Sequence, residues 1–102
     1  MPGVIERPPL PAGPFVVVGL ARSGVAAALA LRSRGAEVLG CDAGSVADDV
    51  RARLEAAGVP VHAPAEGVDL LAPASTVVKS PGVPQDAPVI AAARRLGARV
   101  IG

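Results

Sequence analysis

Hydrophobic positions divide the chain into short apolar runs and longer segments in which apolar residues recur every three to four positions. The first run, 15–18, is mostly β-branched and has no polar alternation, which predicts a strand buried on both faces of a parallel sheet. Similar short runs predict strands at 36–41, 59–62, 76–79 and 99–101. Strands that alternate with helical segments favour an α/β fold.

Helical periodicity predicts three connecting helices, at 22–34, 46–57 and 87–96. Ser45 and Asp86 are the expected side-chain caps of the second and third helices. Glycine follows each predicted helix and is expected to end it, at Gly35, Gly58 and Gly97.

Right-handed crossovers order the predicted strands 3-2-1-4-5, a Rossmann-like open five-stranded parallel sheet flanked by helices on both faces. The chain reverses direction between strands one and four, and ligands in such sheets bind outside the carboxyl ends at this switch point. Three candidate segments come directly after the carboxyl ends of predicted strands one, two and four, respectively: 19–24, Asp42 and 80–82. We expect them to converge in one crevice.

The 19–24 turn has the composition of a phosphate-binding turn. Its first glycine permits a sharp turn, its last lets helix and strand approach, and the N–H groups at the helix start are free to face an anion. Alanine stands where the GxGxxG fingerprint has its middle glycine, so a compact connection without a ligand is the alternative. The residues are Gly19, Leu20, Ala21, Arg22, Ser23 and Gly24.

Asp42 and the 80–82 loop supply the other candidate contacts. A carboxylate after strand two can accept hydrogen bonds from a ribose diol, although Asp42 to Ser45 also has the composition of a turn. In the loop, Gly82 leaves the backbone open to a ligand; a plain turn is the alternative for this segment of Ser80, Pro81 and Gly82.

Composition narrows the function classes. The chain has 102 residues, a net charge of +1 and 1% aromatic residues, with no block of like charges, so neither nucleic acid nor a membrane is an expected partner. No signal peptide or membrane-spanning run is recognisable, which favours the cytoplasm. Residues 1–14, which hold five of the 11 prolines, are expected to form a flexible arm before a single domain at 15–102.

The single cysteine and the single histidine do not suggest chemistry. Cys41 is expected to fill a small core position, and His62 to lie at a strand edge or in a loop. One Cys and one His do not make a zinc site. We expect no catalytic or metal-binding residue.

Several of these segments together resemble the Mur ligases of peptidoglycan synthesis. The resemblance covers 15–102 and rests on VVGLARSGVAAA at 17–28, Cys-Asp at 41–42, VVKSPGVP at 77–84, APVIAAAR at 87–94 and the closing GARVIG. It is greatest to the members that add D-glutamate. It implies an N-terminal Rossmann-like domain that holds the UDP part of UDP-N-acetylmuramoyl-L-alanine.

The resemblance also implies roles for individual residues. It places Arg22 and Ser23 near the diphosphate, Asp42 near the uracil and ribose, and the 80–82 loop against the nucleotide. Ala43 and Gly44 stand where relatives often carry polar side chains that reach the uracil, so at Ala43 only a contact without such a side chain is expected.

Full-length Mur ligases continue into a central ATPase domain and a C-terminal domain, and use ATP and Mg²⁺. This chain has no GxxxxGK[ST] motif, so we expect it to lack those two partner domains, to need no cofactor of its own and not to be catalytic alone. One alternative is an NAD(P)-binding Rossmann module of an oxidoreductase or sensor, against which the alanine in the 19–24 turn and the missing sixth strand argue. Another is an interaction domain that binds no nucleotide.

Overall fold

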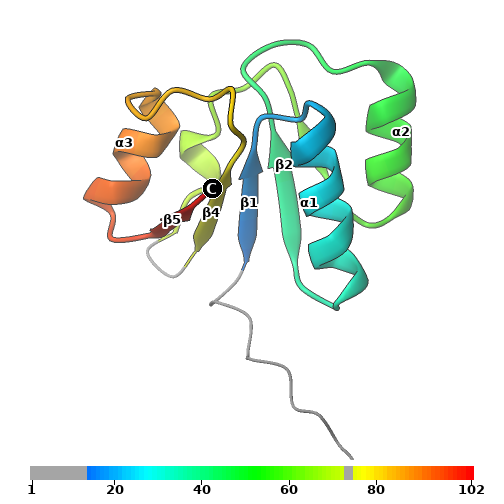
Figure 1. Ribbon diagram of the computed structural model, residues 1–102, viewed down its shortest axis with the longest axis horizontal. Coiled ribbons are helices and arrows are strands. Elements are labelled where there is room, and N and C mark those ends of the chain that lie inside the picture. Colours follow the sequence, from blue (N-terminus) through cyan, green and yellow to red (C-terminus); the bar gives the residue numbers. More distant parts are fainter. Residues whose placement is uncertain (1–13, 73–74) are drawn as a thin grey trace, which may run out of the picture.

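A five-stranded parallel sheet forms the centre of the molecule (Figure 1). The computed structural model describes residues 14–72 and 75–102. The strand order is β3-β2-β1-β4-β5, which confirms the predicted topology. The strands are β1 (Phe15–Val18), β2 (Val38–Cys41), β3 (Val61–His62), β4 (Thr76–Lys79) and β5 (Arg99–Ile101).

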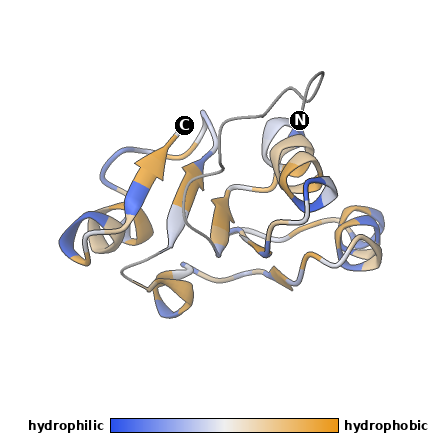
Figure 2. Ribbon diagram, turned by 90° about the horizontal axis from the view of Figure 1, so that it is seen from below, coloured by the Kyte–Doolittle hydropathy of each residue, from blue (hydrophilic) through white to orange (hydrophobic). Residues whose placement is uncertain are grey.

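Helices cover both faces of the sheet, as the pattern predicted. The helices α1 (Arg22–Ser33) and α2 (Asp48–Ala56) pack on one face, and α3 (Pro88–Arg95) and the 3₁₀ turn η1 (Val68–Leu70) on the other. Figure 2 shows hydrophobic strands between helices that carry both hydrophobic and hydrophilic residues. This arrangement gives the domain two apolar layers, one on each side of the sheet.

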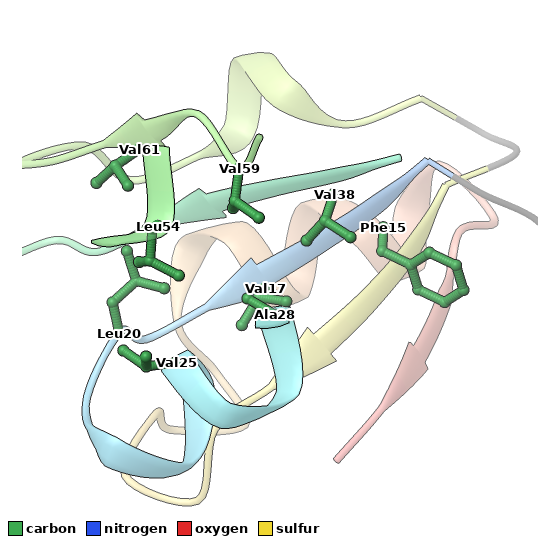
Figure 3. Packing of buried hydrophobic residues seen from close by; sticks show 9 residues of the cluster. All are labelled: Phe15, Val17, Leu20, Val25, Ala28, Val38, Leu54, Val59 and Val61. Atoms are coloured by element: carbon green, nitrogen blue, oxygen red, sulfur yellow. The ribbon is translucent and has the colours of Figure 1, made fainter. Parts of the chain in front are cut away.

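The central strand β1 contributes to both layers because successive side chains of a strand point to opposite faces. Phe15 and Val17 join the layer beneath α1 and α2, where Figure 3 shows them with Ala28 and Leu54. Val16 and Val18 face α3. All four β1 side chains are buried, which confirms the prediction made from their unbroken apolar run.

The predicted helix stops are confirmed, whereas the predicted caps are wrong. The three glycines after the helices adopt positive φ. However, α2 begins after Ala47 rather than Ser45, and α3 begins after Ala87 rather than Asp86, and neither start has a side-chain cap. Other features favour these starts: acidic residues in the first turn of α2 match the helix dipole, and Pro88 at the start of α3 has no N–H to satisfy.

Strands β2 and β3 are shorter than predicted because each pairs with its neighbour over only part of the predicted range. The β2 ladder with β1 starts at the Phe15–Val38 pair, and β3 pairs with β2 through only two residues. Of the expected arm at 1–14, residues 1–13 lie outside the described part of the chain, and the carbonyl of Pro14 accepts the Thr76 N–H. Within the described residues, no helix is long and apolar enough to cross a membrane.

Candidate functional site

A cavity of about 430 Å³ is lined by residues that follow β1 and β4, two strands whose carboxyl ends point to the top of Figure 1. It lies at the switch point, where open parallel sheets bind ligands. The structure brings together the three segments that the sequence placed there. The lining residues are Val18, Gly19, Ala21, Ser23, Asp42, Ala43, Glu66, Ser80, Pro81, Gly82, Val83, Pro84, Ala87 and Val89.

The 19–24 turn joins β1 to α1 by a close backbone approach. Gly19 has a φ of +90°, and its N–H donates to the Cys41 carbonyl (2.9 Å). A Cβ at Gly24 would lie 1.8 Å from the Gly19 carbonyl oxygen, so no side chain fits there. Both glycines therefore have the structural roles predicted for them, a sharp turn and close helix packing.

The start of α1 has free hydrogen-bond donors. The first turn contains no acidic residue and has no side-chain cap. Val25 donates to the Ala21 carbonyl, whereas the N–H groups of residues 22–24 find no acceptor among residues 14–72 and 75–102. These donors and the positive end of the helix dipole favour an anion beside the cavity wall formed by Ala21 and Ser23.

Asp42 connects two backbone segments at the cavity. Its Oδ2 accepts the Leu20 N–H (2.7 Å), and its Oδ1 accepts the Gly44 N–H (2.9 Å). The second bond forms the turn that was the alternative to a ligand contact. Because each carboxylate oxygen can accept more than one hydrogen bond, Asp42 keeps acceptor capacity toward the cavity that it lines.

Ser80 joins the two loops across the switch point. Its N–H donates to the Val18 carbonyl (3.0 Å), and its buried hydroxyl donates to the Gly19 carbonyl (2.7 Å). The hydroxyl hydrogen therefore forms a bond within the protein and is not available to a ligand. By contrast, Gly82 is exposed, and a Cβ built on it would meet nothing within 4 Å.

Three of the predicted site residues do not line the cavity. The Leu20 side chain is buried in the layer beneath α1 and α2, and Gly24 is buried in the first turn of α1 against the Gly19 carbonyl. Arg22 is exposed and borders a neighbouring groove with Arg53, sharing only the Ala21 wall with the cavity. Arg22 has no hydrogen-bond or ion-pair partner in the part of the chain that the structure describes.

The sequence did not predict that the loop after β3 would contribute to the cavity lining. Glu66 lines the cavity because the loop after β3 folds back: the Ala65 N–H donates to the Asp42 carbonyl (2.8 Å). Arg51 links β3 to the start of this loop by donating to the carbonyls of Val61 (3.0 Å) and Ala63 (2.9 Å). The position of Glu66 after the carboxyl end of a strand was the available signal. The apolar lining from Val83 to Val89 also escaped prediction, since it belongs to the loop beyond Gly82 and to α3.

Charge is unevenly distributed around the cavity. Asp42 and Glu66 are its only charged lining residues within the described chain, whereas the free donors lie at the start of α1. The carboxylates suit a neutral group rich in N–H or O–H donors, and the helix start suits an anion. A ligand with both features, such as a nucleoside bearing phosphates, matches this polarity.

Cys41 and His62 lie in different surroundings. Burial, reinforced by the negative charges of Asp42 and Glu66, raises the pKa of the Cys41 thiol to about 11, so it stays protonated and unreactive near neutral pH. His62 is exposed on the outer strand β3. Both placements agree with the interpretation made from the sequence. In the described segments, no three His, Cys, Asp or Glu side chains form a metal-binding group.

Comparisons with known proteins agree on one family. The model of the Mur ligase MurD-like N-terminal domain matches residues 14–102. UDP-N-acetylmuramoylalanine–D-glutamate ligase of Acidobacterium capsulatum is 41% identical over 90 residues, which is 85% of this chain and 19% of that protein. The ligase of the same name from Myxococcus xanthus is 46% identical over 93 residues, 85% of this chain and 20% of that protein.

A solved structure shares the fold. UDP-N-acetylmuramate:L-alanyl-gamma-D-glutamyl-meso-diaminopimelate ligase from Neisseria meningitides superposes with a TM-score of 0.72 at 23% identity, over 85% of this chain and 27% of that one. The chain spans about one fifth of the length of the curated relatives that it matches. The comparisons give no support to the oxidoreductase alternative.

Proposed function

Because the chain belongs to the MurD-like N-terminal domains of the Mur ligases, we propose that its cavity binds the UDP part of UDP-N-acetylmuramoyl-L-alanine. The observation that carries the proposal is the polarity of the site. Free N–H donors at the start of α1 lie beside a cavity whose charged lining groups are Asp42 and Glu66. UDP has the same polarity, with an anionic diphosphate at one end and a donor-bearing nucleoside at the other.

Individual roles follow from this polarity. The diphosphate faces the start of α1, where Ser23 and the free N–H groups lie. The exposed Arg22, the first residue of the helix, supplies a positive charge at the same end. Asp42 accepts hydrogen bonds from the uracil or ribose, and Ala43 contributes a wall without a polar side chain. The exposed backbone at Pro81 and Gly82 lies against the nucleotide.

In the whole enzyme, this domain would hold the UDP end of the substrate in place. We infer that the full-length ligase uses ATP and Mg²⁺ to activate the substrate carboxylate, which the amine of D-glutamate then attacks, and that its central and C-terminal domains carry that chemistry. Binding the UDP end here positions the distant carboxylate, a use of binding energy far from the reacting atoms. We place this work in the cytoplasm and assign no catalytic residue to the chain itself.

Amide chemical shifts recorded during ligand titrations test the proposal. UDP and UDP-N-acetylmuramoyl-L-alanine should shift the amides of 19–24, of residues near Asp42 and of Gly82. Inorganic pyrophosphate should shift chiefly the first of these groups. Selective shifts with NADH instead would favour the dinucleotide-binding alternative. No shift with any of these compounds would favour an interaction domain.

A further inference from the structure

We propose that Lys79 is a positioning residue for the nucleotide site. Its ammonium group holds residues 80–83, here called the 80–83 turn, in the shape that forms one wall of the cavity. The proposal rests on the proposed function for its ligand, but the contacts that carry it lie within the chain itself. Lys79 is not among the lining residues of the cavity, so its effect on a ligand is exerted through the turn.

Lys79 adds side-chain contacts to the backbone hydrogen bond that forms the turn. The Val83 N–H donates to the Ser80 carbonyl (3.0 Å), which makes the turn. Lys79 Nζ donates to the Val83 carbonyl (2.9 Å) and approaches the Ser80 carbonyl at 3.4 Å. A single ammonium thus contacts the carbonyls at both ends of the turn, and charge-assisted bonds of this kind are stronger than neutral ones.

The turn is the part of the loop on which the cavity depends. Ser80, Pro81, Gly82 and Val83 all line the cavity. A Val83 methyl group lies so near Gly19 that a Cβ built there would be 2.8 Å from it. A displacement of the turn would therefore change both this wall and its contact with the 19–24 turn.

The hydrogen bonds of the Lys79 side chain are concentrated on this turn. It is half-buried at the end of β4, and both hydrogen-bond acceptors found for its ammonium group in the described residues are carbonyls of the 80–83 turn. A lysine stem buries methylene groups while its charged end stays near the surface. The Lys79→Met variant keeps much of this stem and removes the donors, so it tests the ammonium contacts themselves.

The experiment compares Lys79→Met with Lys79→Arg in the 102-residue chain. Arg94→Met is the matched control, because it also removes one positive charge from a side chain that donates to the carbonyl (3.4 Å) and Oε1 (2.6 Å) of Gln85, outside the cavity lining. Hydrogen exchange at the Val83 amide is measured without ligand, and UDP affinity by calorimetry. Lys79→Gln replaces Lys79→Met if thermal unfolding shows that the latter does not fold.

Lys79→Met should speed Val83 exchange by about tenfold and weaken UDP binding by about fivefold to tenfold, since losing a charge-assisted bond frees the turn. Lys79→Arg should restore most of both, and Arg94→Met should change neither. Unchanged exchange in Lys79→Met would overturn the proposal, as would faster exchange with unchanged affinity. If the unsubstituted chain does not bind UDP, the proposed function fails, and Val83 exchange alone then decides whether Lys79 holds the turn.

Discussion

Replacing Gly24 by alanine should destabilise the domain, against the usual direction of such a change. In an unobstructed helix, glycine to alanine gains about 1 kcal/mol in helix propensity. At Gly24 the added Cβ would lie 1.8 Å from the Gly19 carbonyl oxygen and 2.7 Å from Ser80 Oγ. The first neighbour is backbone and cannot rotate away, so α1 and the 19–24 turn must separate.

The magnitude follows from these contacts. Overpacking of a buried position costs about 3 kcal/mol at the upper end of its usual range. Moving the Gly19 carbonyl also breaks its bond to the Ser80 hydroxyl (2.7 Å), a loss of about 1 kcal/mol. The gain in helix propensity offsets about 1 kcal/mol. The expected net loss is therefore about 3 kcal/mol of the free energy of unfolding, a large share of what a small domain has.

Urea denaturation followed by circular dichroism measures this loss. Gly82→Ala is the control, because a Cβ there meets nothing within 4 Å and the residue does not require positive φ. Gly24→Ala should have a lower midpoint with an unchanged slope, and the control should match the unsubstituted chain. Equal or greater stability of Gly24→Ala would show that helix and strand do not approach as closely as described.

Three further predictions concern the cavity and its surroundings. Gly82→Ala should weaken UDP binding by about tenfold without changing the urea midpoint, since Gly82 lines the cavity and an added methyl group would meet no protein atom within 4 Å but could meet the ligand; equal affinity in calorimetry would place the ligand elsewhere. Asp42→Ala should weaken UDP and uridine more than inorganic pyrophosphate, and equal losses would show that Asp42 does not contact the nucleoside. Burial raises the pKa of the Cys41 thiol from its ordinary value of 9.0 to about 11, so the folded state binds the thiol proton more tightly than an exposed thiol does. Stability should therefore fall by up to about 2–3 kcal/mol as pH rises from 9 to 11. Cys41→Ala should lack this part of the pH dependence in urea titrations, and an identical pH profile for the two chains would contradict the assigned burial.

Sequence reasoning succeeded where a local signal matched the tertiary requirement. The unbroken apolar run at 15–18 predicted a central strand because only a strand buried on both faces tolerates it. Glycines after the helices marked their ends because they alone adopt positive φ cheaply. Caps were harder to predict. Ser45 and Asp86 have the right residue types, but Ala47 and Ala87 hold the cap positions, where first-turn acidic residues in α2 and Pro88 in α3 favour the start instead.

The order of strands and the convergence of three loops at the switch point followed from the sequence by itself, because the handedness of crossovers leaves few arrangements for such a pattern. Only the tertiary structure decided which way each loop side chain points. It turned Leu20 into the core and placed Arg22 beside a neighbouring groove. It also brought Glu66 to the cavity lining and joined Lys79 to the 80–83 turn. These choices depend on contacts between residues far apart in the chain, and hydrophobic periodicity carries no information about them.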